Sequence, residues 1–164
     1  MKLSLYDRDA AVAYARQWAM SRNPQYYDYE KLGGDCTNFA SQCIFAGGGV
    51  MNYKPTFGWY YNSANDHSPS WTGVEYLYNF LMTKTGAGPV GREVDMAQAE
   101  PGDISQFADT SSRFSHTQVI TAVGGKPSLD NILICAHTFD SLDRALSTYQ
   151  FLKIRFIHIE GIRG

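Results

Sequence analysis

The first half of the chain carries apolar residues with the period of helices. One apolar stripe follows Asp7, a residue type that caps helix N-termini, and stops before the Asn-Pro pair at 23–24. Its members recur at i, i+3, i+4 and i+7, and they are Ala11, Tyr14, Ala15 and Trp18. This pattern predicts a helix between residues 7 and 23 whose stripe faces the core.

Two further helices are predicted downstream. One begins abruptly at Asp35 and Cys36, directly after two glycines, and three consecutive glycines end it. The other begins at Thr72, where Glu75 completes a capping box, and a Gly-Ala-Gly-Pro run closes it. Between them, residues 51–70 are rich in Asn, Ser, Tyr and Pro, which predicts a long surface loop of the kind that borders functional sites.

The last third of the chain shows the alternation of β-strands. The predicted strands cover residues 104–107, 116–123, 131–137 and 152–159. Helices followed by antiparallel strands are typical of an α+β fold. No linker, internal repeat or low-complexity tract interrupts the chain, so we expect one domain over residues 1–164.

Composition limits the classes of protein to which this chain can belong. Of its 164 residues, 44% are hydrophobic and 18% are charged, a balance that excludes intrinsic disorder and a collagen-like repeat. The net charge of −2 lacks the positive surplus of nucleic-acid-binding proteins, so we expect no nucleic-acid partner. No apolar run approaches the roughly 20 residues of a membrane span, and the first residues turn polar too early for a signal peptide. We therefore expect a cytoplasmic protein, unless the chain is cut from an exported, spore or cell-wall protein. The pattern indicates no oligomeric state.

The three cysteines are expected to be free thiols. Cys36 and Cys43 lie on one predicted helix, about 10 Å apart by the rise of 1.5 Å per residue, which is too far for a disulfide. Cys43 falls on the apolar face of that helix, and Cys135 falls inside a predicted strand. Both are therefore expected to be core residues.

Cys36 differs from the other two because it lies in the first turn of its helix. Unpaired backbone N–H groups and the positive end of the helix dipole converge there, and both stabilise a thiolate. The neighbouring Asp35 is expected to turn back and cap the amide groups of the helix start. The alternative interpretation of Cys36 is a buried structural cysteine.

A thiol nucleophile needs a base, and the chain has four histidines. His116 opens a predicted strand and His137 ends one, so both can be held rigidly at the border of a cleft. Two neighbouring antiparallel strands would bring these two together. His67 in the polar loop is expected at the surface, and His158 in the last strand is expected in the core or at a sheet edge.

Several short motifs together resemble a known family. They are Gly-Gly-Asp-Cys-Thr-Asn-Phe-Ala-Ser-Gln-Cys at 33–43, the glycines at 47–49, Gly-Asp at 102–103, Ser-His-Thr at 115–117 and Ala-His-Thr-Phe-Asp at 136–140. The combination resembles the bacterial putative amidase domain family, which belongs with the papain-like cysteine hydrolases of the NlpC/P60 and CHAP type. The resemblance extends over nearly the whole chain. It implies N-terminal helices, one with the nucleophile at its N-terminus, packed on a C-terminal antiparallel sheet.

The resemblance also implies roles for individual residues. By position, Cys36 is the nucleophile and His116 the general base. The third residue of such sites is often a second histidine on the next strand, which is His137 here. Asp140 is the second candidate because it follows the same strand, and Asp35 is a candidate supporting residue.

The oxyanion donors are only partly implied. The backbone N–H of Cys36 points out of the helix start and is the first candidate. Papain-like enzymes place an amide side chain six residues before the cysteine, where this chain has Glu30. Tyrosines of the preceding segment are the candidates for a second donor, and they are Tyr26, Tyr27 and Tyr29.

Together these residues predict amide hydrolysis without a metal or another cofactor. Cys36 attacks the carbonyl, and His116 protonates the leaving amine and later activates water against the thioester. Aromatic residues of the long loop and its border, Trp59, Tyr61 and Trp71, are candidates for lining a cleft for peptides. The family resemblance suggests peptidoglycan stem peptides as the substrate.

Three alternative interpretations remain open. A metal site built from Cys36, His116 and the Cys-Ala-His run at 135–137 matches no zinc-site spacing. A catalytically idle module that binds peptides or cell wall would share the fold, because activity depends on the geometry of the site. An acyltransferase would share the acyl-enzyme step and differ only in the acceptor.

Overall fold

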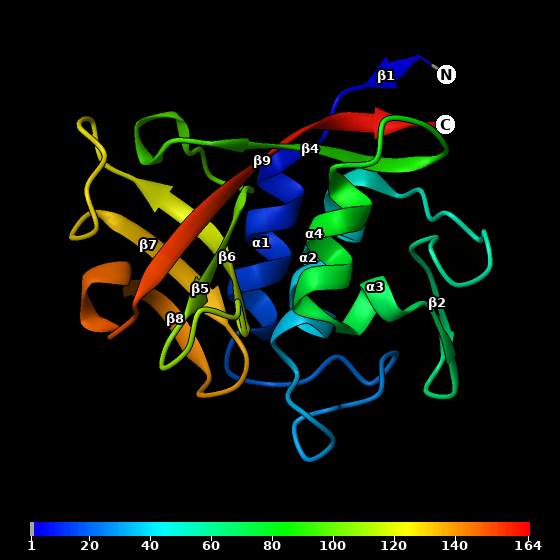
Figure 1. Cartoon of the computed structure of the whole chain (residues 1–164), viewed down its shortest axis with the longest axis horizontal. Helices are drawn as coiled ribbons and strands as arrows, with labels where there is room; N and C mark the ends of the chain where they lie inside the picture. Colours follow the sequence, from blue (N-terminus) through cyan, green and yellow to red (C-terminus); the bar gives the residue numbers. More distant parts are fainter. Residues whose placement is uncertain (1) are drawn as a thin grey trace.

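The four α-helices lie in the first half of the chain and the longer strands in the second half of the computed structural model, which describes residues 2–164 (Figure 1). The helices are α1 (Arg8–Trp18), α2 (Cys36–Gly48), α3 (Pro69–Thr72) and α4 (Val74–Leu81), with short 3-10 turns η1 (Met96–Gln98) and η2 (Leu146–Thr148). The strands are β1 (Leu3–Ser4), β2 (Tyr61–Ser63), β3 (Asp66–His67), β4 (Gly88–Val94), β5 (Ile104–Ala108), β6 (His116–Val123), β7 (Ile132–Ala136), β8 (Ser141–Ala145) and β9 (Lys153–Arg163). The predicted α+β class is confirmed.

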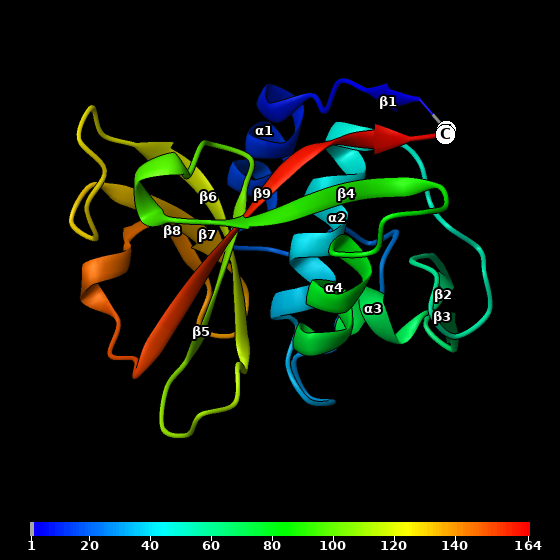
Figure 2. The same ribbon diagram turned by 45° about the horizontal axis from the view of Figure 1, so that its top comes forward.

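The main sheet has seven strands. Six follow the order β1-β9-β5-β6-β7-β8, and β4 pairs with β9 along the edge opposite to β5. All of these pairs are antiparallel. Beyond its pairing with β5, the long strand β9 runs on with β4 as a ribbon that passes over the helices (Figure 2). Helices α1 and α2 pack against β6 from one side, so the start of α2 lies at the end of the sheet where β6 begins.

Helix α2 has the limits that the glycines predict. It begins at Cys36, and Gly49 ends it in the left-handed conformation with φ of 71°. Gly47 is required by close packing, because a Cβ there would lie 2.7 Å from the carbonyl oxygen of Asp7. The predicted cap of the first helix is also confirmed, since the Asp7 side chain accepts a hydrogen bond from the Ala10 N–H at 3.0 Å.

The aromatic residues predicted to line a cleft lie in the core instead. Trp59 and Trp71 are fully buried and pack on each other with ring centroids 4.7 Å apart. Their indole N–H groups donate to Ser41 Oγ at 3.1 Å and to Asn38 Oδ1 at 2.9 Å, both on α2. A buried indole is stable only with such a partner, so these two residues hold the long loop against α2.

Other departures from the pattern concern loops and edge strands. Residues 51–70 contain the hairpin β2–β3, and the predicted capping box at Thr72 is not formed because α3 ends there and Gly73 precedes α4. Strands β4 and β8 were not predicted. Two glycines and a proline in β4 disfavour the formation of a strand. They are tolerated because β4 lies at an edge of the sheet. Within residues 2–164, no helix combines the length and the apolar character needed to cross a bilayer.

Candidate active site

Cys36 is the first residue of α2 and lines a cavity of about 150 Å³ at the end of the sheet. Its residue is 8% exposed, and its Sγ lies 3.7 Å from Oγ1 of Thr37. The cavity walls come from the ends of β5, β6 and β7 and from the segment before β9. The lining residues include Phe107, Asp109, His116, Gln118, Phe139 and Tyr149.

The structure brings His116 to Cys36. Hydrogen bonds with the Cys36 thiol and with Asp109 raise the pKa of His116 above its ordinary value, although burial acts in the opposite direction. Nε2 of His116 lies 3.0 Å from Oδ2 of Asp109. The imidazole therefore lies between a thiol and a carboxylate.

Asp109 was not among the candidates from the sequence. It directly follows β5, and the β5–β6 hairpin places it beside His116, because Phe107 pairs with His116 in the register of the two strands. Its Oδ1 accepts the N–H of Thr110 at 2.7 Å. The hydrogen bond with His116, followed by that with the Thr110 N–H, lowers the pKa of Asp109. The signal for it was a polar residue at the end of a strand whose hairpin partner begins with a histidine.

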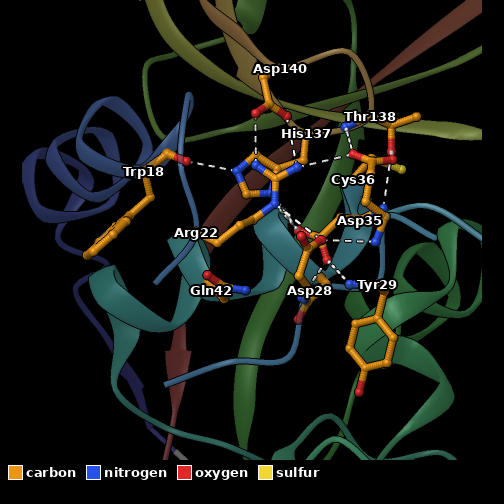
Figure 3. A network of polar contacts seen from close by, with 12 residues as sticks. Trp18, Arg22, Asp28, Tyr29, Asp35, Cys36, Gln42, His137, Thr138 and Asp140 are labelled. Atoms are coloured by element: carbon orange, nitrogen blue, oxygen red, sulfur yellow. Dashed lines mark hydrogen bonds and ion pairs between the residues drawn. The ribbon is translucent and has the colours of Figure 1, made fainter. Parts of the chain in front are cut away.

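His137 reaches the same cavity but is engaged elsewhere (Figure 3). Its Nδ1 lies 2.5 Å from Oδ2 of Asp35 and its Nε2 lies 2.8 Å from the carbonyl oxygen of Trp18. The ring also stacks on Phe39, with centroids 4.0 Å apart. Both ring nitrogens of His137 therefore face Asp35 and Trp18, whereas the side chain that contacts His116 is Asp109.

Asp35 does not cap the helix start as predicted. It is 1% exposed, and no hydrogen bond joins its side chain to the first amides of α2. Its Oδ1 instead accepts hydrogen bonds from the backbone N–H of Tyr29 and from the side-chain NH₂ group of Asn38, each at 2.8 Å, while Oδ2 faces His137. The buried Asp35 side chain thus ties the start of α2 to the residue that follows β7.

Asp140, the other candidate for the third residue, binds an arginine. Its two oxygens lie 2.9 and 3.0 Å from Nη1 and Nη2 of Arg22. Arg22 also approaches Glu30 and Asp28, each at 3.2 Å. Burial acts against the charge of Arg22, but the hydrogen bonds and negative charges of Asp140 and Asp28 together outweigh it and raise the pKa of the guanidinium. Asp140 is thus placed in a charge cluster with Arg22 (Figure 3).

Glu30 braces the loop beside the cavity. Its oxygens accept the N–H and the hydroxyl of Thr138 at 2.9 and 3.0 Å, and Oγ1 of Thr138 accepts the N–H of Asp35 at 3.1 Å. Thr138 and Phe139 both have positive φ, of 60° and 63°, a strained conformation that these contacts hold in place. Phe139 is 83% exposed at the border of the cavity.

The tyrosines proposed as second oxyanion donors are directed to other partners. The hydroxyl of Tyr29 donates to the carbonyl of Ala64 at 2.8 Å, and the ring of Tyr26 stacks on Trp71. Tyr27 packs edge-on against Tyr29. None of the three lines the cavity at Cys36.

Tyr61 also lies away from the cavity. Its ring centroid is 5.0 Å from that of Tyr26, and its hydroxyl accepts the N–H of Tyr27 at 2.8 Å. Aromatic walls are supplied instead by Phe107, Phe139 and Tyr149, which come from the sheet side. The apolar lining of the cavity therefore comes from other residues than the sequence pattern predicted.

One group of side chains has the composition of a metal site but is already filled by a cation. The ligand atoms of Glu100, Asp103 and His158 lie within 4.8 Å of one another. Nη1 of Arg8 lies 2.7 Å from Asp103, and its Nη2 lies 3.4 Å from Nδ1 of His158. The guanidinium thus supplies the positive charge that a metal ion would bring.

Comparisons with known proteins place the chain in a family context. The family model described as Putative amidase domain matches residues 5–159. Over 139 residues the chain is 32% identical to a Bacillus subtilis (strain 168) protein named "Uncharacterized protein YhbB"; the alignment covers 83% of this chain and 42% of that protein. The chain thus spans less than half the length of this relative. No solved structure matches the chain significantly.

Proposed function

The chain belongs to the Putative amidase domain family, and on that premise we propose that it is a cysteine-dependent amide hydrolase with Cys36 as the nucleophile. His116 is the proton carrier, and Asp109 is the residue that orients it. One observation carries the proposal: His116 lines the same cavity as Cys36, and its imidazole hydrogen-bonds the carboxylate of Asp109 at 3.0 Å.

The geometry supplies each step of acyl transfer. Asp109 accepts the Nε2–H of His116, which fixes the tautomer and turns Nδ1 to the sulfur. The thiolate of Cys36 attacks the amide carbonyl, and the imidazolium gives its proton to the leaving amine as the C–N bond breaks. His116 then takes a proton from water, which attacks the thioester and releases the acid. The sulfur leaves as the thiolate and the imidazolium pair is restored.

Charge on the carbonyl oxygen needs a donor at the helix start. The first N–H groups of a helix have no intrahelical acceptor, and that of Cys36 lies beside its own sulfur. One such donor typically contributes about 10²–10³ in rate. Asp35, which was expected to occupy these amides, is bound to His137 instead, so it does not compete for this position.

The fold and substrate class are part of the proposal. A helix that carries the nucleophile at its N-terminus and packs on an antiparallel sheet that carries the histidine is the papain-like, NlpC/P60-type arrangement, acting as one domain over residues 1–164. We propose peptide amides as substrates, with peptidoglycan stem peptides as the first to be tested. Support for that choice comes from the motifs around Cys36 and His116, and from the aromatic walls of the cavity.

The proposal is tested by digestion of purified peptidoglycan, with released fragments identified by mass spectrometry. Wild-type protein is expected to release amine-terminated fragments, whereas Cys36→Ala releases none and His116→Ala few. His67→Ala serves as the matched control, because His67 binds Tyr29 away from the cavity. If an added amine captures the acyl group, the protein is an acyltransferase.

Selective labelling tests the site without a substrate. Burial raises the pKa of both Cys43 and Cys135. Iodoacetamide at pH 6 is therefore expected to label Cys36 first, and His116→Ala is expected to slow that labelling. Equal labelling of the three thiols would favour a binding module without catalysis.

A further inference from the structure

A chain of buried hydrogen bonds leads from an arginine to the sulfur of Cys36. Nε and Nη2 of Arg155 both donate to Oε1 of Gln106, at 2.9 and 2.6 Å. Nε2 of Gln106 donates to Oγ1 of Thr117 at 3.2 Å, and this atom lies 3.0 Å from Oγ1 of Thr37. The last contact is that of Thr37 Oγ1 with Sγ of Cys36, at 3.7 Å. The side chains thus form a continuous path from a cation to the nucleophile.

The direction of the first link is fixed by charge. A guanidinium can only donate, so the carboxamide oxygen of Gln106 faces Arg155 and its NH₂ group faces away. That NH₂ group also donates to the carbonyl oxygen of Val74 at 3.0 Å, and a flipped amide would lose both sets of contacts. Arg155 is itself held by an ion pair with Glu75 and by the ring of Phe114, whose centroid is 3.9 Å from the guanidinium carbon.

The hydroxyl directions follow from this first link. Thr117 accepts from Gln106, and Thr37 is the other polar partner of the Thr117 hydroxyl within residues 2–164. The hydrogen of Thr117 therefore points to Thr37, because a buried hydroxyl without an acceptor is unfavourable. The hydrogen of Thr37 is then left for its remaining neighbour in the described chain, which is Sγ of Cys36. Gln106, Thr117 and Thr37 are each exposed by 1% or less, so water does not reverse the order.

We propose that Thr37 is a catalytic residue whose hydroxyl donates to the thiolate of Cys36, and that Thr117 and Gln106 are positioning residues that keep this hydroxyl turned toward the sulfur. The inference rests on the proposed function of Cys36 as the nucleophile. A donor to sulfur stabilises the thiolate more than the thiol, since hydrogen bonds to charged acceptors are the stronger ones. Once the sulfur is acylated, the Thr37 hydroxyl no longer has a charged acceptor. The hydroxyl therefore acts on the ionisation of the thiol.

The test measures the rate of Cys36 alkylation by iodoacetamide between pH 4 and pH 9 on the whole chain, by peptide mapping. Thr37→Val keeps the shape of the side chain and removes the donor. It is expected to slow alkylation at pH 6 by about 3- to 10-fold and to leave the rate near pH 9 unchanged. Thr37→Ser retains the hydroxyl and is expected to follow the wild-type profile.

A double variant separates the donor from packing. Thr37→Val leaves the Thr117 hydroxyl unpaired and so lowers the melting temperature, whereas Thr37→Val with Thr117→Val removes both hydroxyls and regains part of that loss. If the donor matters, the double variant stays as slow at pH 6 as the single one. Thr121→Val is the matched control on β6, because the hydroxyl of Thr121 binds Asp143 at 2.6 Å, outside this path.

The outcomes decide two different questions. A wild-type pH profile in Thr37→Val, or a double variant that regains the wild-type rate, overturns the role of Thr37. If His116→Ala shows the same pH profile as the wild-type protein, the proposed function is overturned instead. In that case the comparison of Thr37→Val with Thr37→Ser still shows whether the hydroxyl acts on the sulfur.

Discussion

Replacement of Asp35 tests the buried pair that it forms with His137 next to the nucleophile's helix. Both ring nitrogens of His137 face acceptors, which are the Asp35 carboxylate at 2.5 Å and the carbonyl oxygen of Trp18 at 2.8 Å. A neutral imidazole donates from one nitrogen only. One proton therefore lies between Nδ1 of His137 and Oδ2 of Asp35, and Nε2–H donates to Trp18, so each of these two buried side chains depends on the other for its hydrogen bond.

Asp35→Ala is expected to be strongly destabilising. It removes the acceptor of His137 and also that of the Tyr29 N–H and the Asn38 amide. Removing one partner of a buried charge pair costs about 3–5 kcal/mol. One kcal/mol corresponds to roughly 2–4 °C in a domain of this size, so the melting temperature should fall by about 6–20 °C.

Asp35→Asn is expected to cost much less. Its carboxamide oxygen keeps the two donors from Tyr29 and Asn38, and its NH₂ group can donate to Nδ1 of a neutral His137. Nε2–H of His137 still donates to Trp18, so both ring nitrogens of His137 keep a partner. The expected loss is about 1 kcal/mol, or roughly 2–4 °C.

Thermal unfolding at pH 7, followed by circular dichroism, compares the two variants. Glu160→Ala is the control, because its ion pair with Arg92 is exposed and contributes about 0–1 kcal/mol at most. The reasoning about the protons of His137 is refuted if Asp35→Asn melts as low as Asp35→Ala. It is equally refuted if Asp35→Ala melts no lower than the control.

Three further results are expected from the same site and its scaffold. Beside Cys36, Asp109 is the partner whose hydrogen bond raises the pKa of His116, so Asp109→Asn should move the alkaline limb of the pH profile of hydrolysis to lower pH; an unmoved limb would contradict the assignment. Because this pKa is raised, protonated His116 adds stability that is fully present below its ordinary pKa of 6.5 and is lost as pH rises through the folded value. The stability difference between wild type and His116→Ala in urea should therefore shrink from pH 5 to pH 9. Gly47→Ala should cost about 1–3 kcal/mol in urea unfolding because its Cβ would meet a backbone oxygen at 2.7 Å, whereas Gly125→Ala, with no atom within 4 Å, should cost little.

The start of α2 could be predicted from local signals alone. Two glycines before Asp35 and three glycines after residue 46 set the limits of α2, and both effects depend on backbone conformation within a few residues. His116 at the start of a strand was also visible, because alternation of apolar residues begins there. Strand β4 was hidden since its glycines and its proline are tolerated only by its place at a sheet edge.

The contacts of His137 and the position of Asp109 beside His116 could not be predicted from the pattern. Every residue of β7 except Leu133 is buried, so hydropathy does not show which face of the strand the following histidine takes. The answer depends on two tertiary facts. The end of β7 meets α1, where the Trp18 carbonyl accepts from His137, and the β5–β6 register sets Asp109 beside His116.

The polar residues of α2 show why a hydropathy pattern underestimates this site. Thr37, Asn38 and Ser41 have polar side chains, yet each is buried and bound to a residue from another element. Asn38 and Ser41 accept the indole N–H groups that fix the long loop, and Thr37 meets Thr117 beside the cysteine. A buried polar group must be paired, so a helix with polar residues on several faces can be enclosed on all sides only where its neighbours supply partners. The polar residues beside Cys36 are therefore compatible with burial because the elements around α2 supply their partners, and Thr37 links the thiol to one of them, Thr117 on β6.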